Sequence, residues 1–281
     1  MKLMRVGPEG KERPAIADNS GRIRDLSGRV PDFAGTAVSN SALDAIRAID
    51  LETLPIIEAP GRIGACLASV PNFYCIGLNY AKHAAETGAT PPAEPIIFNK
   101  ATSCLSGPND PVIIPRKSVK TDWEVELGVV IGREALYVSE QDALDYVSGY
   151  CTINDVSERE FQIERGGQWT KGKSAPSFGP IGPWLVTADE VPDPQALRLW
   201  LSLNGKVVQD SDTSDMIFTV RQIISYMSQF MKLMPGDIIA TGTPSGVGLG
   251  MKPPVFLKPG DVMELEIEGL GRQKQVAQSA E

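Results

Sequence analysis

The central apolar segment of the chain reads Asp122-Trp123-Glu124-Val125-Glu126-Leu127-Gly128-Val129-Val130-Ile131. Acidic and apolar residues alternate in its first half, as they do in a β-strand, so the side chains of Glu124 and Glu126 point to the same face. Neighbouring like charges repel each other unless water or a cation lies against them. The segment therefore predicts either an exposed edge strand with a polar face or a strand that presents two carboxylates to a bound cation.

A third carboxylate follows another apolar strand. Residues 147–153 form that predicted strand, and Asn154 and Asp155 come directly after it. Three carboxylates without paired histidines suit a hard, oxygen-preferring ion such as Mg²⁺ or Mn²⁺. Zinc is disfavoured, because one histidine and four scattered cysteines do not supply its usual ligand set. Glu124, Glu126 and Asp155 are therefore candidate metal ligands.

Short apolar runs recur on both sides of these two strands. The chain contains 27 Gly and 22 Pro, which suits many short strands joined by turns. Two longer helices are expected, at residues 140–147 and 220–231. The pattern predicts a mainly β protein with a few helices (α+β), built as a barrel-like or rolled sheet. The strands are expected at residues 73–78, 96–98, 112–114, 125–131, 147–153, 184–186, 199–203, 237–240 and 262–267.

The residue pattern of the N-terminal segment differs from that of the rest of the chain and predicts a small α/β domain at residues 1–68. Its expected strands are residues 2–6, 15–18 and 22–26, with a turn at Asn19-Ser20-Gly21, and a helix is expected at 41–50. We interpret this domain as a scaffold or a dimerisation element. Residues 69–281 then form a second domain, which carries the candidate site.

His83 is the only histidine of the chain and lies in a short predicted helix, residues 80–86, which Asn79 is expected to cap. Glu86 lies three residues further on the same side, so its carboxylate can orient the imidazole and raise its basicity. The pair is either a general base that activates water or a surface ion pair on an amphipathic helix. Residues 87–95 are rich in Gly and Pro and are typical of a mobile connector.

Four further polar residues stand near turns or strand ends. Lys100, Lys173 and Arg159 are single cations that could meet a substrate carboxylate, or be solvated surface residues. Thr243 lies in the turn Thr-Gly-Thr-Pro at residues 241–244, where its hydroxyl could hold an anionic oxygen or serve the turn alone.

The composition argues against several classes of partner. The chain has 27 Lys and Arg against 35 Asp and Glu, a formal charge of −8, which repels nucleic-acid phosphates and anionic lipid. Charges occupy the positions where a signal peptide would be apolar. The cysteines lie among apolar neighbours without a C-x-x-C pair, which predicts buried, reduced thiols. We therefore expect a soluble cytoplasmic protein that acts on a small molecule.

Taken together, the segments over about residues 70–270 resemble the fumarylacetoacetate hydrolase family, in the same order along the chain. Each segment alone has low specificity, and their joint occurrence is highly specific. The matching segments are Ile76-Gly-Leu-Asn-Tyr-Ala-Lys-His-Ala-Ala-Glu86, Asp122-Trp-Glu-Val-Glu-Leu127, Gly149-Tyr150, Asn154-Asp-Val-Ser-Glu-Arg159, Lys173-Ser174, Gly182-Pro-Trp184, Asn204-Gly205 and Gly236-Asp-Ile-Ile-Ala-Thr-Gly-Thr-Pro-Ser-Gly-Val-Gly248.

The resemblance implies a β-roll catalytic domain, a homodimer and a site for Mg²⁺ or Mn²⁺. It assigns the metal to Glu124, Glu126 and Asp155, and a catalytic dyad on a lid helix to His83 and Glu86. It also implies that Lys173, Gln162 and Thr243 contact the substrate, and Lys173 is expected in catalysis. Arg159 and Lys100, the two other cations, are further expected substrate contacts. The chain departs from the family pattern after Lys173, where residues 174–177 lack an Asp that is often found there.

The activity that follows from this resemblance is hydrolysis of the carbon–carbon bond of a 2,4-dioxo acid, which yields pyruvate and a second acid. The sequence most resembles the subgroup that acts on 2,4-diketo-3-deoxy-L-rhamnonate or L-fuconate, many relatives of which are labelled ureidoglycolate lyases. Three alternatives share the fold: oxaloacetate decarboxylase, hydroxydienoate isomerase and ureidoglycolate lyase. A fourth is a metabolite-binding protein without turnover.

Overall fold

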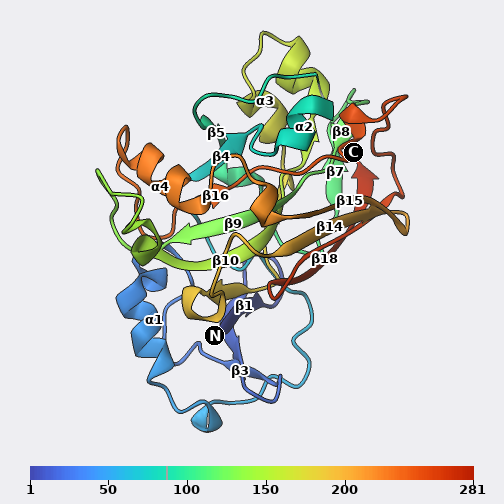
Figure 1. Ribbon diagram of the computed structural model, residues 1–281. Helices are drawn as coiled ribbons and strands as arrows, with labels where there is room; N and C mark the ends of the chain where they lie inside the picture. The colour runs from blue at the N-terminus through green and yellow to red at the C-terminus, as the bar shows by residue number, and fades with distance from the viewer. Residues whose placement is uncertain (87) are drawn as a thin grey trace.

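The computed structural model describes residues 1–86 and 88–281, and its main feature is a nine-stranded, mostly antiparallel sheet (Figure 1). Strand β9 (Val125–Ile131) lies near its middle, between β10 (Val147–Asn154) and β16 (Ile238–Ala240). From one edge to the other, the strands are β3 (Ile23–Asp25), β2 (Arg13–Ala17), β1 (Lys2–Val6), β13 (Leu185–Thr187), β10 (Val147–Asn154), β9 (Val125–Ile131), β16 (Ile238–Ala240), β4 (Phe73–Gly77) and β5 (Ile96–Lys100).

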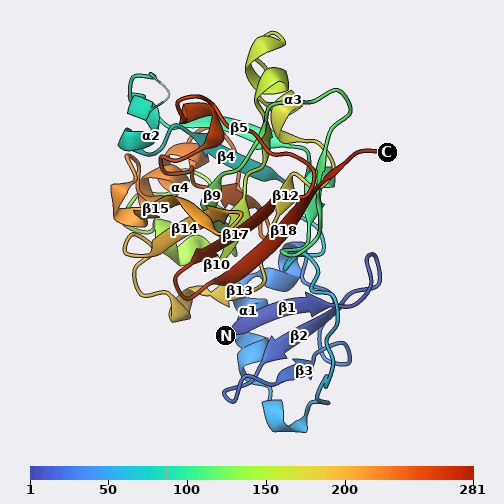
Figure 2. The same ribbon diagram turned by 90° about the vertical axis from the view of Figure 1, so that its right-hand side faces the viewer.

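A second sheet of five strands packs against the middle of the first, and Figure 2 shows β17 (Val262–Ile267) and β18 (Gly271–Ser279) running beside β10. Buried glutamines of β18 make part of this contact, since Gln273 Nε2 donates to the Thr152 carbonyl at 2.7 Å. In order, this sheet contains β15 (Lys206–Asp212), β14 (Arg198–Leu203), β17 (Val262–Ile267), β18 (Gly271–Ser279) and β7 (Val112–Ile114). Two small strand pairs also form: β8 (Thr121–Asp122) with β11 (Ser157–Glu158), and β6 (Leu105–Ser106) with β12 (Gly179–Pro180).

The helices are short and lie around the sheets. In Figure 1, α2 and α3 lie at one end of the molecule, and the N-terminal strands lie at the other. The α-helices are α1 (Asn40–Arg47), α2 (Ala81–Glu86), α3 (Thr170–Lys173) and α4 (Val220–Ser228), and a π-helical turn, η5, covers Glu160–Glu164. The 3₁₀ turns are η1 (Gly35–Val38), η2 (Leu51–Thr53), η3 (Thr102–Cys104), η4 (Ala143–Tyr146), η6 (Ala188–Glu190), η7 (Thr213–Asp215) and η8 (Gly248–Gly250).

The predicted fold class, mainly β with a few helices, is confirmed. The predicted strands at 2–6, 112–114, 125–131 and 262–267 match their observed bounds. The predicted helix at 140–147 is wrong: only η4 (Ala143–Tyr146) forms, because Val147 already belongs to β10. Strands β15 and β18 were not predicted, since both are rich in polar residues and Gln273 and Gln275 of β18 are buried.

The predicted cap at Asn79 is also wrong. Its amide nitrogen donates to the carbonyls of Phe218 and Thr241 at 3.0 and 2.8 Å, and its Oδ1 accepts from the Phe218 amide at 2.8 Å. Asn79 therefore joins β4 to two distant loops instead of starting α2. The connector predicted at 87–95 begins with Thr87, which lies outside the described residues.

The N-terminal strands continue the main sheet, because β1 pairs antiparallel with β13 at Lys2–Val186 and Leu3–Leu185. Leu3 and Phe33 also belong to the largest hydrophobic core. The division into domains 1–68 and 69–281 stays a prediction. All four cysteines are buried and unbridged, as expected. Among the described residues, no helix combines the length and apolarity needed to cross a bilayer.

Candidate active site

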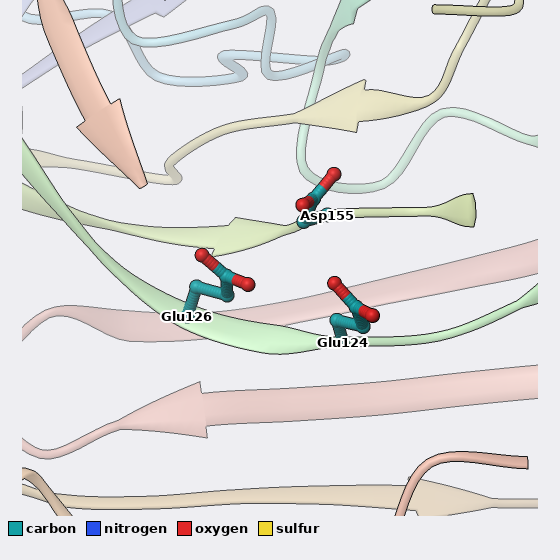
Figure 3. Close-up of side chains that lie close together, drawn as sticks. All are labelled: Glu124, Glu126 and Asp155. Atoms are coloured by element: carbon teal, nitrogen blue, oxygen red, sulfur yellow. The ribbon is translucent and has the colours of Figure 1, made fainter. Parts of the chain in front are cut away.

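Three carboxylates come together where β9 and β10 pair. Glu124 immediately precedes β9, Glu126 lies within it, and Asp155 directly follows β10. Antiparallel pairing sets Ile153 opposite Glu126, and the Asp155 amide donates to the Glu124 carbonyl at 2.8 Å. One oxygen from each carboxylate lies within 4.8 Å of the others. Figure 3 shows the three carboxyl groups turned toward one another.

The site is buried, which excludes the edge-strand interpretation of this segment. Glu124 and Glu126 are 4% and 2% exposed, and β9 has hydrogen-bonded neighbours on both sides. Carboxylates taken out of water require compensating charge or hydrogen bonds. The side chains around Glu124, Glu126 and Asp155, which we call the carboxylate triad, supply part of that compensation.

Three cationic side chains contact the triad. Lys173 Nζ donates to Glu124 Oε2 at 2.6 Å and to Asp155 Oδ2 at 2.7 Å. Lys100 Nζ donates to the other oxygen of Asp155. Arg159 Nη2 lies 2.7 Å from Glu124 Oε1. Glu124 and Asp155 are therefore paired with cationic side chains of the protein.

These pairs set the charge states of the groups involved. Burial alone would lower the pKa of Lys173, but the charges of Asp155 and Glu124 raise that pKa above its ordinary value. Burial alone would raise the pKa of Glu124, but Lys173 and Arg159 hold it well below its ordinary value. Lys173 is therefore a cation at neutral pH, so it can stabilise negative charge and cannot act as a base.

The electrostatic environment of Glu126 differs from that of Glu124 and Asp155. Its Oε2 accepts a hydrogen bond from the Gly242 amide at 2.8 Å. Burial first, and then the charges of Asp155 and Glu124, raise the pKa of Glu126 well above its ordinary value. A divalent cation would relieve this deficit of positive charge, and an all-oxygen donor set suits a hard ion. The three residues therefore fit a divalent metal ion.

His83 and Glu86 lie together on α2. His83 Nδ1 is 3.7 Å from Glu86 Oε2, and His83 is 7% exposed, so the pair is not a solvated surface ion pair. The Gly246 amide lies within hydrogen-bond distance of both oxygens of Glu86, at 3.1 and 3.0 Å. Burial alone would raise the pKa of Glu86, but His83 and the Gly246 amide lower it below its ordinary value. Glu86 is therefore an ionised partner for the imidazole.

A cavity of about 220 Å³ joins the two groups. It receives Glu124, Glu126 and Lys173 from one side of the site and His83 from α2. The complete lining is Ile76, Gly77, Leu78, His83, Ala89, Phe98, Glu124, Glu126, Arg159, Gln162, Ile163, Trp169, Lys173, Thr243 and Leu249. A small molecule in this cavity would contact two of the three carboxylates, a fixed cation and a histidine at once.

Two of the expected substrate contacts have other partners in the structure. Lys100 is buried against Asp155 and is not part of the cavity lining. Thr243 lines the cavity, but its hydroxyl donates to the Val125 carbonyl at 2.9 Å and accepts from Gln209 Nε2 at 2.8 Å. Arg159 and Gln162 both line the cavity and are joined by a hydrogen bond of 3.0 Å.

Asp122 is a site residue that sequence reasoning missed. Its Oδ2 accepts from Arg159 Nε at 2.8 Å, and its two oxygens accept from the amides of Gly248 and Leu249 at 2.7 and 3.0 Å. It therefore holds Arg159 and a loop of the cavity in place. Its position two residues before Glu124 was the only available signal. Trp169 was also missed, because a single aromatic residue in a Gly-rich stretch carries no recognisable pattern.

The comparisons with known proteins agree with this geometry. Residues 72–277 match the family model described as "Fumarylacetoacetate (FAA) hydrolase C-terminal". The chain therefore belongs to the fumarylacetoacetate hydrolase family. A Burkholderia orbicola protein named "Putative hydrolase" is 60% identical over 282 residues, covering all of both chains.

Three solved structures have the same fold over nearly their whole length. Fumarylacetoacetate hydrolase from Exiguobacterium antarcticum superposes with a TM-score of 0.89 at 34% identity, over 100% of both chains. Maleylpyruvate hydrolase from Sphingobium sp. SYK-6 has a TM-score of 0.82 at 29% identity, again over 100% of both chains. A 2-hydroxyhepta-2,4-diene-1,7-dioate isomerase from Mycobacterium marinum has a TM-score of 0.75 at 32% identity, over 99% of this chain and 98% of that one. The relatives thus include hydrolases and an isomerase.

Proposed function

We propose that the protein is a divalent-metal-dependent hydrolase that cleaves the carbon–carbon bond of a 2,4-dioxo acid to give pyruvate and a second acid. The observation that carries this proposal is one cavity lined by His83 and by Glu124 and Glu126, two of the three clustered carboxylates. The names of two structural relatives, fumarylacetoacetate hydrolase and maleylpyruvate hydrolase, support the same reaction class.

Glu124, Glu126 and Asp155 would hold Mg²⁺ or Mn²⁺ in this enzyme. When bound, the ion would supply a Lewis acid that polarises the 2-oxo group of the substrate and balances its carboxylate charge. Three protein ligands leave coordination positions for substrate oxygens, which is the arrangement expected of a catalytic site. Asp155 is held in place by Lys100, so we assign Lys100 to positioning this ligand.

His83 takes the proton of the attacking water in the proposed mechanism. Glu86, ionised and fixed by the Gly246 amide, orients the imidazole and stabilises its protonated form. The water oxygen adds to the 4-oxo carbon, and the bond between C3 and C4 breaks with its electron pair on C3. C4 leaves as the second acid, and the enolate of pyruvate is protonated on C3.

Lys173 stabilises the negative charge that develops on the departing enolate. Its ammonium group is buried beside Glu124 and Asp155 and stays charged at neutral pH. A preorganised cation in a buried site costs no reorganisation when charge develops. Arg159 and Gln162 line the same cavity, and we assign them to contacts with the substrate. Thr243 shapes the wall beside them.

The experiment that tests this proposal is pyruvate release coupled to lactate dehydrogenase, with Mg²⁺ and with EDTA. The panel contains acetylpyruvate, 2,4-diketo-3-deoxyrhamnonate, oxaloacetate and ureidoglycolate, the last measured as glyoxylate. Metal-dependent cleavage of a diketo acid is expected. Turnover of oxaloacetate or ureidoglycolate alone would contradict the proposed reaction class, and metal-dependent binding without turnover would make the protein a metabolite binder.

A hydroxydienoate isomerase remains the second candidate, because two structural relatives carry that activity in their names. An isomerase moves a proton and does not consume water, so it needs no base for water activation. The buried His83–Glu86 pair therefore favours the hydrolase. We also propose that the protein forms a homodimer, which light scattering of the purified protein would test. Its proposed location is the cytoplasm.

A further inference from the structure

The cavity has one charged end, and most of the remaining lining is apolar. Glu124, Glu126, Lys173 and Arg159 provide the charged groups, and His83 also lines the cavity. Apart from Gln162 and Thr243, the other lining side chains of the described residues are apolar, and the Trp169 indole nitrogen is their one hydrogen-bonding atom. These apolar side chains are Ile76, Leu78, Ala89, Phe98, Ile163, Trp169 and Leu249.

A continuous set of ring contacts leads from the charged end into this apolar part. Lys173 Nζ, which bonds the triad, lies 5.2 Å from the centre of the Phe98 ring. The Phe98 and Trp169 rings are 5.2 Å apart and meet edge to face at 69°. The Trp169 ring in turn packs on Gly77, where a Cβ would lie 2.4 Å from its Cζ3. Gly77 therefore leaves the space that the indole fills.

We call this apolar part of the lining the apolar wall. The Thr243 hydroxyl and the Gln162 carbonyl oxygen, which line the same cavity, already have partners within the protein. The Thr243 hydroxyl donates to the Val125 carbonyl and accepts from Gln209. The Gln162 carbonyl oxygen accepts from Arg159 Nη1 at 3.0 Å. A substrate with several hydroxyl groups would need to replace its water contacts here, and these side chains offer few acceptors for it. An apolar group, by contrast, would lose no hydrogen bond on entering.

Resting on the proposed function, we propose that the acyl half of the substrate is apolar, and that a flat aromatic group suits it best. The carboxylate and 2-oxo group bind at the charged end, and the acyl group lies against Phe98 and Trp169. Offset and edge-to-face ring contacts favour an aromatic acyl group over a small aliphatic one. The wall thus selects against the polyhydroxylated sugar acids that the sequence resemblance favoured.

The test compares kcat/KM, with Mg²⁺, for benzoylpyruvate, acetylpyruvate and 2,4-diketo-3-deoxyrhamnonate. Each additional apolar group that is buried in a fitted pocket raises kcat/KM by roughly 10- to 200-fold. A hydroxyl group that the pocket does not accommodate lowers kcat/KM by up to about 100-fold. We therefore expect benzoylpyruvate to exceed acetylpyruvate by about 10-fold or more, and the sugar acid to be the poorest. A sugar acid that equals or exceeds benzoylpyruvate would overturn the inference and leave the hydrolase standing.

Variants at the wall sharpen this test. Trp169→Ala is expected to reduce the benzoylpyruvate-to-acetylpyruvate ratio of kcat/KM about 10-fold, and Trp169→Phe is expected to restore most of it. The matched control is Phe230→Ala, an aromatic residue that is 64% exposed and outside the cavity lining. An unchanged ratio in folded Trp169→Ala would contradict the assigned contact.

A binding measurement separates failure of this inference from failure of the proposed function. If no diketo acid is cleaved, the hydrolase proposal falls, and calorimetric titration with the same three acids and Mg²⁺ becomes decisive. Tighter binding of benzoylpyruvate, weakened by Trp169→Ala, would uphold the apolar wall. Preferential binding of the sugar acid, or no binding at all, would overturn it.

Discussion

Replacement of Lys173 by methionine is the sharpest test of the site, because this ammonium group contacts two of the three carboxylates. Its Nζ lies 2.6 Å from Glu124 and 2.7 Å from Asp155, and the side chain is 3% exposed. Methionine keeps most of the volume and removes the charge. The two carboxylates would then face each other, with only Lys100 and Arg159 to balance them.

The expected loss of stability follows from this burial. Removal of one partner of a buried ion pair costs about 3–5 kcal/mol, because the remaining charge is left without compensation. With an unfolding entropy of roughly 2.1 cal/mol/K per residue, a chain of 281 residues has about 0.6 kcal/mol/K. The melting temperature of the metal-free Lys173→Met protein should therefore fall by about 5–8 °C.

Magnesium should reverse much of this loss. A site with one positive charge fewer attracts Mg²⁺ more strongly, and a ligand that binds only the folded protein stabilises it in proportion to its affinity. Differential scanning fluorimetry in EDTA and along a Mg²⁺ series measures both effects. Mg²⁺ should raise the melting temperature of Lys173→Met from a lower concentration than in the wild type. Pyruvate release should fall by about 10²- to 10³-fold, since the charge that stabilises the enolate is gone.

The matched control is Lys232→Met. Lys232 forms an exposed ion pair with Glu134 at 3.4 Å, and such pairs contribute about 0–1 kcal/mol. Its melting temperature and Mg²⁺ response should stay close to those of the wild type. The reasoning would be refuted if both variants lost the same stability in EDTA, or if Mg²⁺ acted on Lys173→Met at the same concentration as on the wild type.

Four further outcomes are expected. His83→Ala should lower pyruvate release by about 10²- to 10⁴-fold while Mg²⁺ still raises the melting temperature; unchanged turnover would exclude His83 as the base. Gly250→Ala should lower activity, because its Cβ would lie 2.4 Å from the Glu86 side chain, and normal steady-state kinetics would contradict that contact. Glu126 has a folded pKa above its unfolded value of 4.5, so the metal-free protein should lose stability as the pH rises past 4.5 through the folded pKa. Since Mg²⁺ removes that penalty, the difference in melting temperature between Mg²⁺ and EDTA should widen with pH, and a constant difference would count against it. Thr219→Ala removes the capping box of α4 and should cost about 1 kcal/mol in urea unfolding, whereas Thr219→Ser should cost less.

Local periodicity was enough to predict much of the fold. The strands at 125–131 and 262–267 follow from alternating or continuous apolar residues, because this pattern depends on whether one or both faces of a strand are buried. The same rule placed Glu124 and Glu126 on one face, and Figure 3 shows them turned toward Asp155. It failed at β15 and β18, where Gln209, Gln273 and Gln275 occupy buried positions because each amide group bonds to a residue of the nine-stranded sheet.

The sequence by itself determined which chemical groups are present and which pairs share a strand face or a helix turn. Only the tertiary structure showed whether those groups are solvated. Glu124 and Glu126 are compatible with an exposed edge until β10 and β16 are seen to flank β9. Only the structure shows that Lys100 bonds to Asp155 and that Thr243 accepts from Gln209.

The apolar wall of the cavity is the clearest case of a tertiary property. Gly77, Phe98 and Trp169 come from three separate segments, and nothing in the sequence near any one of them indicates the other two. Spacing along a chain encodes local geometry, because neighbouring side chains are related by a fixed backbone repeat. Burial and contacts between distant segments depend on how the sheets fold over one another. For this reason the sequence indicates the chemistry of the site, and the packing determines the shape of the cavity that receives the substrate.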